Sequence, residues 1–271
     1  MICLQLFLDR GRAPKLDVMF VDEAQDLSPL QWAVVRKLCE SADRIYIAGD
    51  DDQAIYRWAG ADVDYLIRNS KDAMILKQSY RVPSSIHKIA QNCIGQVASR
   101  VQKSWNPRKE AGHVSWEPSY ETIDMETGEW LVLARTNYLL NGIEEHCRSE
   151  GWFYKSKNRN SVSEKKVKAV RDWETLRQGG EIPIVDLTKV LNYMKIRVPI
   201  SLERNDFDTN ISFDQAQQFV PDLKKEYWYD LFDGISVSER SYIRAMLRRG
   251  EKITKEPRIK LSTIHAAKGG E

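Results

Sequence analysis

The stretch Asp17–Gly60 reads DVMFVDEAQDLSPLQWAVVRKLCESADRIYIAGDDDQAIYRWAG, and it decides the fold of the first part of the chain. A first apolar run at 18–21 ends in an Asp-Glu pair, and a second run at 45–48 ends in Gly-Asp-Asp-Asp-Gln. Short apolar runs of this kind are typical of strands buried on both faces of a parallel sheet. The carboxyl ends of such strands meet where open α/β sheets bind ligands. The stretch therefore predicts two parallel strands that bring acidic side chains to one polar site.

A helix is predicted between the two strands. Ser28 is a favourable N-cap, Pro29 suits the first helical position, and Gln31 completes a capping box. The apolar residues that follow recur at helical spacing, namely Leu30, Ala33, Val34 and Leu38. Strand, helix and strand together predict a βαβ unit.

The acids after the first strand suit the chemistry of a magnesium–nucleotide complex. Mg²⁺ prefers hard oxygen ligands and is commonly held by one or two carboxylates together with phosphates and waters. Asp22 is placed to hold that ion, and Glu23 is placed to orient and deprotonate an attacking water. The alternative is an acidic pair that merely ends a strand in a loop.

Four segments resemble motifs of one helicase family. Val21–Asp26 (VDEAQD) and Gly49–Asp62 (GDDDQAIYRWAGAD) resemble motifs II and III of superfamily 1 DNA helicases of the UvrD/Rep/PcrA type. Leu76–Arg81 (LKQSYR) is similar to motif IV, and Ile259–Glu271 (IKLSTIHAAKGGE) is similar to motif V. The four segments occur in the family's order. One departure is Ala59, which stands where many relatives carry arginine.

The resemblance implies an α/β fold with partial RecA-like, parallel-sheet motor domains of the P-loop NTPase type and a mainly helical insertion. It implies ATP and Mg²⁺ as cofactors, and single-stranded and duplex DNA as partners. The implied activity is ATP-dependent translocation along single-stranded DNA with duplex unwinding, in the 3′-to-5′ direction typical of these relatives. Such enzymes serve DNA repair and DNA replication.

The resemblance also implies roles for individual residues. Catalytic roles fall to Glu23, to Gln53 as sensor of the γ-phosphate, and to Arg81, which would cross a domain cleft to that phosphate. Nucleotide-binding roles fall to Asp22, which would also bind the metal, and to Gln25, Gln53, Arg81 and Glu271. DNA-binding roles fall to Tyr56, Trp58, Arg135, Asn137, Thr263 and His265.

Structural alternatives remain open for several of these residues. Tyr56 and Trp58 also suit a hydrophobic core, and Arg81 also suits a surface ion pair. Thr136 or Asn137 is equally suited to cap a helix.

Four parts of the chain are predicted from the order of the motifs. Residues 1–76 would be the C-terminal part of RecA-like domain 1A, and 77–156 the first part of domain 2A. Residues 157–257 would form an insertion like the family's 2B domain, and 258–271 would return to domain 2A.

Further elements follow from local patterns. Strands are predicted at 74–76, 114–116, 130–134 and 259–264, and a helix that runs to Glu150 is expected to stop at Gly151. A helix capped by Ser84 or Ser85 would bury one face, which comprises Ile86, Ile89, Ala90, Cys93, Ile94 and Val97.

The insertion shows two amphipathic helix patterns, an aromatic cluster and two basic clusters. The first helix pattern is Val167, Val170, Trp173 and Leu176, and the second is Leu187, Val190, Leu191 and Met194. The aromatic cluster at 227–232 suits a core better than a platform for bases. The basic clusters at 165–171 and 244–252 suit either solvated helix faces or phosphate contacts.

Composition describes a globular chain. The 271 residues are 42% hydrophobic and 30% charged with a net charge of +2, which neither requires nor excludes a nucleic-acid partner. The four cysteines form no CxxC pair, so reduced thiols are expected. No apolar run approaches the roughly 20 residues that span a bilayer, so a cytoplasmic protein without a membrane partner is expected.

The phosphate-binding loop GxxxxGK(S/T) is not in the sequence, because none of the 14 glycines is followed by lysine. The chain also stops inside motif V. We therefore expect a fragment of a helicase that does not hydrolyse ATP alone. The alternatives are a non-catalytic single-stranded-DNA-binding or regulatory module, and one half of a split helicase, with the missing P-loop portion supplied by another chain.

Overall fold

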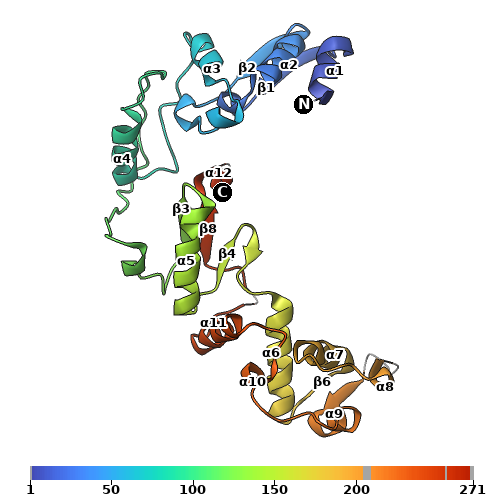
Figure 1. The fold of residues 1–271 in the computed structure, drawn as a ribbon. Coiled ribbons are helices and arrows are strands. Elements are labelled where there is room, and N and C mark those ends of the chain that lie inside the picture. Colours follow the sequence, from blue (N-terminus) through green and yellow to red (C-terminus); the bar gives the residue numbers. More distant parts are fainter. Residues whose placement is uncertain (1, 204–208, 254, 269–271) are drawn as a thin grey trace. The chain divides into compact units, whose positions relative to one another are not determined.

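The computed structural model describes residues 2–203, 209–253 and 255–268. The chain forms two compact units, Met1–Trp116 and Glu117–Glu271, both shown in Figure 1. The first unit extends well past residue 76, where the motif order places a domain boundary. The reason is that residues 101–112 bond back along residues 77–85, as in the hydrogen bond from Asn106 N to Lys77 O at 2.7 Å.

The predicted βαβ unit is present in the first unit (Figure 1). It follows α1 (Ile2–Arg10) and consists of β1 (Leu16–Val21), α2 (Pro29–Cys39) and β2 (Ala42–Ile47). The two strands pair in parallel with Val18 opposite Arg44 and Val21 opposite Ile47. Short 3₁₀ turns follow each strand, η1 (Ala24–Asp26) after β1 and η2 (Asp51–Gln53) after β2.

The predicted capping box starts α2. The Ser28 hydroxyl accepts a hydrogen bond from Gln31 N at 3.4 Å, and the Gln31 side-chain oxygen accepts one from Ser28 N at 2.8 Å. Two backbone donors at the helix start are thereby satisfied.

Replacing the cap is expected to weaken this helix. Ser28→Ala removes the acceptor for Gln31 N and should lower the local stability of α2 by about 1 kcal/mol. The measurement is hydrogen exchange at the α2 amides. Ser28→Asp keeps an acceptor and should stay within a few tenths of a kcal/mol of wild type. Equal protection in both variants would contradict the assigned cap.

The prediction that both strands are buried on both faces is wrong. Strand alternation sends Met19 and Val21 to one face, where they pack with Trp32 of α2. Phe20 lies on the other face, is 76% exposed and stacks on Tyr46 with ring centroids 5.1 Å apart. Within the described residues the helices α2 and α3 (Val63–Asn69) cover one face only.

Two of the predicted strands and one predicted core face are also wrong. Residues 74–76 and 114–116 form no strand, and their large side chains are exposed, Met74 by 86% and Trp116 by 84%. The helix α4 (Ser84–Ile94) is present, but Ile86 and Val97 are exposed by 42% and 47%, because the described part of the first unit packs nothing over them. Neither serine is the N-cap, since Pro83 holds that position.

The second unit is built on a four-stranded sheet with the order β3–β8–β4–β5. The strands are β3 (Trp130–Ala134), β4 (Tyr154–Ser156), β5 (Arg159–Asn160) and β8 (Ile259–Thr263). β8 pairs in parallel with both β3 and β4, and β4 and β5 form an antiparallel hairpin. The strand β8, which comes last in sequence, therefore lies between two strands that precede it, β3 and β4.

Helices accompany this sheet. η4 (Tyr120–Thr122) precedes it, α5 (Asn137–Glu150) connects β3 to β4, and α12 (Ile264–Ala267) follows β8. As predicted, α5 ends at Gly151, which has a φ of 72°. A Cβ there would lie 2.8 Å from the Cβ of Ala245, so the site suits only glycine.

Between β5 and β8 the chain forms a mainly helical insertion. Its elements are α6 (Glu164–Arg177), β6 (Glu181–Pro183), α7 (Ile184–Tyr193), α8 (Ile200–Glu203), β7 (Asn210–Ser212), α9 (Phe213–Phe219), α10 (Trp228–Leu231) and α11 (Val237–Arg248). β6 and β7 form a small antiparallel sheet. Both predicted amphipathic helices are confirmed, as α6 and α7, with their predicted apolar faces buried.

One continuous core joins the insertion to the sheet. Trp173, Leu187 and Ile243 of the insertion are fully buried in the same cluster as Ile259 and Leu261 of β8. In the aromatic cluster Trp228 and Phe232 are buried, as expected of core residues, whereas Tyr227 is 48% exposed.

Ion pairs occupy part of the basic clusters. They join Lys166 to Glu239, Lys168 to Asp172 and Asp186, and Arg249 to Glu126 and Glu150. The ion pairs of these three side chains agree with the interpretation of the basic clusters as helix surfaces. In the described ranges, no helix is long and apolar enough to cross a lipid bilayer.

Candidate functional site

The turn after β1 positions the predicted catalytic acid. Asp22 and Glu23 are both exposed, and Asp22 Oδ1 accepts a hydrogen bond from Glu23 N at 2.8 Å. Glu23 has φ 49° and ψ 39°, a left-handed conformation that is uncommon for a residue with a side chain. Such outliers cluster at functional sites. The turn is held by Ala24 N, which donates to Ala48 O at 3.0 Å beyond the end of β2.

Gln25 joins the ends of the two strands. Its side chain is 1% exposed, its Nε2 donates to Glu23 Oε2 at 2.5 Å, and its Oε1 accepts from Asp50 N at 2.9 Å. A Cβ on Gly49 would lie 2.8 Å from Gln25 Oε1, so glycine is needed for this close approach. Gln25 therefore fixes the carboxylate of Glu23 relative to β2.

Gln53 lies at the end of η2 in the same cluster. Its Nε2 donates to Asp50 Oδ2 at 2.8 Å, while Asp50 Oδ1 accepts from Asp52 N at 3.2 Å. Asp22, Glu23, Gln25 and Gln53 are thus brought together by hydrogen bonds around the C-terminal ends of β1 and β2. This is the arrangement that the sequence predicts.

The cluster suits a magnesium site in which phosphates and waters supply most of the ligands. Among the described residues, no group of three His, Cys, Asp or Glu side chains is arranged to enclose a metal ion. Mg²⁺ needs only one or two carboxylates when phosphates and waters complete its shell. Asp22 offers an exposed carboxylate for that purpose.

The predicted DNA-contacting aromatics lie just after η2. Trp58 lies in η3 (Arg57–Ala59) and is 74% exposed, so the alternative that it is a core residue is wrong. Tyr56 is half-buried. Arg57 holds this turn through two hydrogen bonds to Asp64 at 2.9 and 3.0 Å.

Arg81 lies in the same unit but is not bonded to the acid cluster. Its side chain is exposed, and its backbone N donates to Ser79 Oγ at 3.3 Å. Within the described part of the chain its guanidinium has no ion pair, so the alternative of a surface ion pair is not realised.

The remaining DNA-contact candidates gather at one edge of the sheet in the second unit. Ala134 is opposite Thr263 in the pairing of β3 with β8, so Arg135 and His265 follow strand ends at the same edge. Thr263 Oγ1 accepts from Ala266 N at 3.2 Å and caps α12. Thr136 is the N-cap of α5 without a side-chain cap bond, and Asn137 is the exposed first residue of that helix. Glu271 and Gly269 lie outside the described residues.

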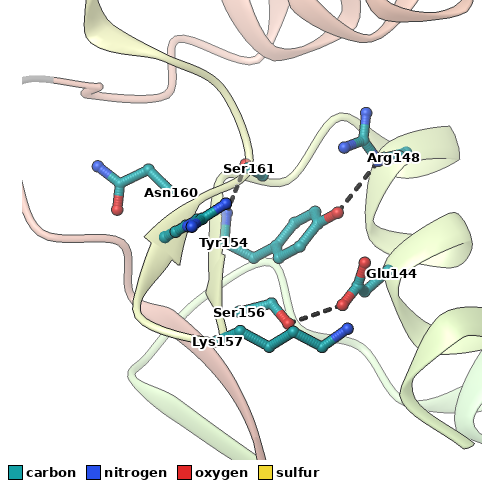
Figure 2. Close-up of a pocket in the computed structure, with 8 residues that line it drawn as sticks. Glu144, Arg148, Tyr154, Ser156, Lys157, Asn160 and Ser161 are labelled. Carbon is teal, nitrogen blue, oxygen red and sulfur yellow. Dashed lines mark hydrogen bonds between the residues drawn. The ribbon is translucent and has the colours of Figure 1, made fainter. Parts of the chain in front are cut away.

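A pocket of about 450 Å³ lies between the β4–β5 hairpin and α5 (Figure 2). Ser156 Oγ donates to Glu144 Oε1 at 2.7 Å, and Arg148 Nε donates to Tyr154 OH at 3.1 Å. None of the residues predicted as functional lines this pocket.

Two cations that no sequence pattern identifies bind the acids after β2. Arg100 donates to both oxygens of Asp52, at 2.8 and 2.6 Å, and Lys103 contacts Asp50, Asp51 and Asp52. Three successive aspartates signal that counter-charges are needed if they are buried. The sequence offers no way to tell which of its 41 basic residues supply them.

The protonation states of these groups follow from their contacts. Burial alone would raise the pKa of Asp52, but hydrogen bonds from Arg100 and Lys103 outweigh it and hold that pKa below its usual value. Burial would lower the pKa of Lys103, but the surrounding aspartates hold it above its usual value. The stabilisation from Asp52 is therefore complete above the ordinary aspartate pKa, and is lost only as the pH falls through the still lower folded value.

A protein-family model matches the segment that contains this acid cluster. The model of the UvrD/REP helicase N-terminal domain family matches residues 9–74. The ATP-dependent DNA helicase PcrA of Bacillus subtilis is 28% identical over 208 residues, which are 73% of this chain and 26% of that protein. A probable DNA helicase II homologue of Rickettsia felis is 36% identical over 164 residues, 52% of this chain and 25% of that protein.

DNA helicase II of Escherichia coli is 32% identical over 112 residues, 39% of this chain and 16% of that protein. The chain thus spans about a quarter, or less, of the length of these relatives. Residues 9–74 contain β1, α2, β2 and the bonded acid cluster. These matches and the motifs support the interpretation of the chain as a fragment of a UvrD/PcrA-type superfamily 1 helicase.

Proposed function

We propose that the chain forms part of an ATP-driven DNA helicase that translocates along single-stranded DNA in the 3′-to-5′ direction. The observation that carries the proposal is the bonded cluster of Glu23, Gln25, Asp50 and Gln53, which joins the ends of two parallel strands. This cluster lies in the segment that matches the helicase family.

The chemistry of ATP hydrolysis would divide among a few residues. Bound Mg²⁺ neutralises charge on the phosphates, and Asp22 would hold it. Glu23 would orient the attacking water and accept its proton, while Gln53 would donate hydrogen bonds toward the γ-phosphate. The guanidinium of Arg81 would stabilise charge on the transferred group. Gln25 and Glu271 would complete the nucleotide site.

DNA contacts would come from both units. Trp58 offers an exposed indole on which a base can stack whatever the sequence. Tyr56 would support it, and Arg135, Asn137, Thr263 and His265 would contact the phosphate backbone from the edge of the second sheet.

We infer the domain division from the motifs together with the sheet. Residues 1–76 would belong to RecA-like domain 1A, and 77–156 with 258–271 to domain 2A, interrupted by a 2B-like insertion at 157–257. The insertion of β8 between β3 and β4 supports the return of the chain to one domain after the insertion.

The phosphate-binding loop would be supplied by a segment outside these 271 residues. Its backbone amides and lysine are a large part of transition-state stabilisation in such enzymes. The chain alone is therefore expected to show no DNA-stimulated turnover. A non-catalytic single-strand-binding or regulatory module is the second candidate, favoured by the exposure of Trp58.

A complementation assay tests the proposal. The full chain is assayed for Mg²⁺-dependent ATP hydrolysis with and without single-stranded DNA, alone and together with a separately expressed segment that carries GxxxxGK(S/T). DNA-stimulated turnover should appear only in the mixture. DNA binding without turnover in any mixture would favour the binding module.

Trp58→Ala is expected to weaken single-strand binding by about 1–3 kcal/mol, which is roughly 5- to 150-fold, because one stacked base is lost. The measurement is fluorescence anisotropy with a labelled oligothymidine. Trp116→Ala removes another highly exposed indole and serves as the matched control. If both variants bind the oligonucleotide as tightly as wild type, then no DNA base stacks on Trp58.

A further inference from the structure

Three aspartates after β2 pair with two cations from one short segment that follows α4. Arg100 Nε and Nη2 bond to the two oxygens of Asp52 at 2.8 and 2.6 Å. Lys103 Nζ contacts Asp51, and lies 2.9 Å from Asp50 Oδ1 and 3.1 Å from Asp52 Oδ2. The backbone N of Val101 also donates to Asp51 Oδ2 at 2.7 Å. We call Asp51, Asp52, Arg100 and Lys103 the acid clamp.

The clamp is shielded from water. The side chains of Asp51 and Arg100 are 6% and 8% exposed, and those of Lys103 and Asp52 are 12% and 13% exposed. Ion pairs with this little exposure are weakly screened by salt. Removal of one cation would leave adjacent carboxylates with too few counter-charges, which is strongly unfavourable.

One end of the clamp meets the turn that carries Gln53. Gln53 directly follows Asp52, and its side chain bonds to Asp50, which Lys103 also contacts. The orientation of the Gln53 amide therefore depends on aspartates that the clamp holds in place.

The other end leads to the loop that carries Arg81. Three residues after Lys103, Asn106 N donates to Lys77 O at 2.7 Å and Asn106 O accepts from Ser79 N at 2.9 Å. Ser79 Oγ in turn accepts from Arg81 N at 3.3 Å and from Val82 N at 3.2 Å. The segment that pairs with the aspartates is thus hydrogen-bonded directly to Lys77 and Ser79, just before Arg81.

We propose that Arg100 and Lys103 are positioning residues that tie the Gln53 turn to the Arg81 loop, and we call this linkage the frame. Neither cation needs to touch nucleotide for this role. The inference rests on the proposed function, because the frame matters only if Gln53 and Arg81 act on the same phosphate. The small Trp32 core is made by other residues, so the frame can be loosened without removal of that core.

The first test needs no nucleotide. In the full chain, the NMR signals of the Gln53 side-chain amide and of Arg81 Nε–H are compared between wild type and Lys103→Met. Both signals should shift in the variant, and Lys103→Arg should restore both toward wild type. Lys109→Met, which removes an exposed lysine of the same segment, should move neither signal. Unchanged Gln53 and Arg81 signals in folded Lys103→Met would overturn the proposal, as would a shift of Gln53 alone.

A milder variant covers the case in which Lys103→Met does not fold. Arg100→Lys keeps the charge but loses the paired hydrogen bonds to Asp52. It should shift the same two signals by smaller amounts, and an unshifted Arg81 signal would count against the frame.

The second test uses the complemented ATPase. Misplacement of catalytic groups by about 1 Å costs on the order of 10²-fold in rate. Lys103→Met should therefore lower kcat by up to that factor with little change in KM, and Lys103→Arg should recover most of it. No turnover in the wild-type mixture would refute the proposed function while the NMR result still decides whether the frame exists.

Discussion

Replacement of Glu23 by glutamine is expected to lower DNA-stimulated ATP turnover of the complemented protein by about 10²- to 10⁴-fold, the usual contribution of a general base. Glutamine has the same shape, and its side-chain oxygen can still accept the hydrogen bond from Gln25. It cannot accept a proton from water. The left-handed backbone at Glu23 and the hydrogen bond from Gln25 orient this carboxylate. KM for ATP should change little. The measurement is steady-state hydrolysis with saturating single-stranded DNA.

Glu40→Gln is the matched control for that prediction. Glu40 is an exposed carboxylate at the end of α2, away from the acid cluster, and its replacement should leave kcat within twofold of wild type. Retention of wild-type kcat in Glu23→Gln would show that another group accepts the proton. A rise in KM without a fall in kcat would place Glu23 in nucleotide binding instead.

Trp173→Ala is expected to lower the free energy of unfolding of the second unit by about 3–5 kcal/mol. The Trp173 side chain is fully buried, packs against Phe213 with ring centroids 5.9 Å apart, and donates from Nε1 to Glu226 O at 2.9 Å. Truncation leaves a cavity and a buried carbonyl oxygen without its donor. The measurement is urea denaturation of the full chain, followed by circular dichroism.

Lys165→Ala changes an exposed residue of the same helix and should stay within about 0.5 kcal/mol of wild type. Hydrogen exchange adds a sharper test, because the insertion and β8 share one core. Amides of Ile259 and Leu261 should lose protection in Trp173→Ala together with those of α6. Loss confined to α6 would show that the insertion unfolds separately from the sheet.

Local patterns predict much of this fold. The capping box at Ser28 and the apolar stripes of α6 and α7 depend on residues within a few positions of each other, and all three helices form where their patterns place them. The stop of α5 at Gly151 follows from the same kind of local rule.

The sequence does not determine which residues pack against each helix or strand. An apolar run such as 18–21 predicts a strand, but only the packing reveals that Phe20 stays exposed while Val21 is buried. The same limit explains the wrong strands at 74–76 and 114–116, where apolar residues find no neighbouring strand to pair with in the described chain.

The candidate site divides in the same way. Asp22, Glu23 and Gln53 are predicted because strand ends and motifs identify them directly. The bridging role of Gln25 and the cations Arg100 and Lys103 depend on contacts between residues 25 to 52 positions apart. Sequence spacing carries no signal for such contacts, so they appear only in the folded structure.

The inner position of β8 has a consequence for synthesis on the ribosome. β3 and β4 emerge early, but the strand that joins them follows about 100 residues later. At ordinary elongation rates of about 5–20 residues per second, this leaves the two strands without their shared neighbour for roughly 5–20 s. During that interval the helices of the insertion can form locally, because their contacts are short in sequence. Nascent chains arrested before residue 259 should therefore contain helix but no parallel sheet in this unit, and closure of that sheet is the late step of its folding.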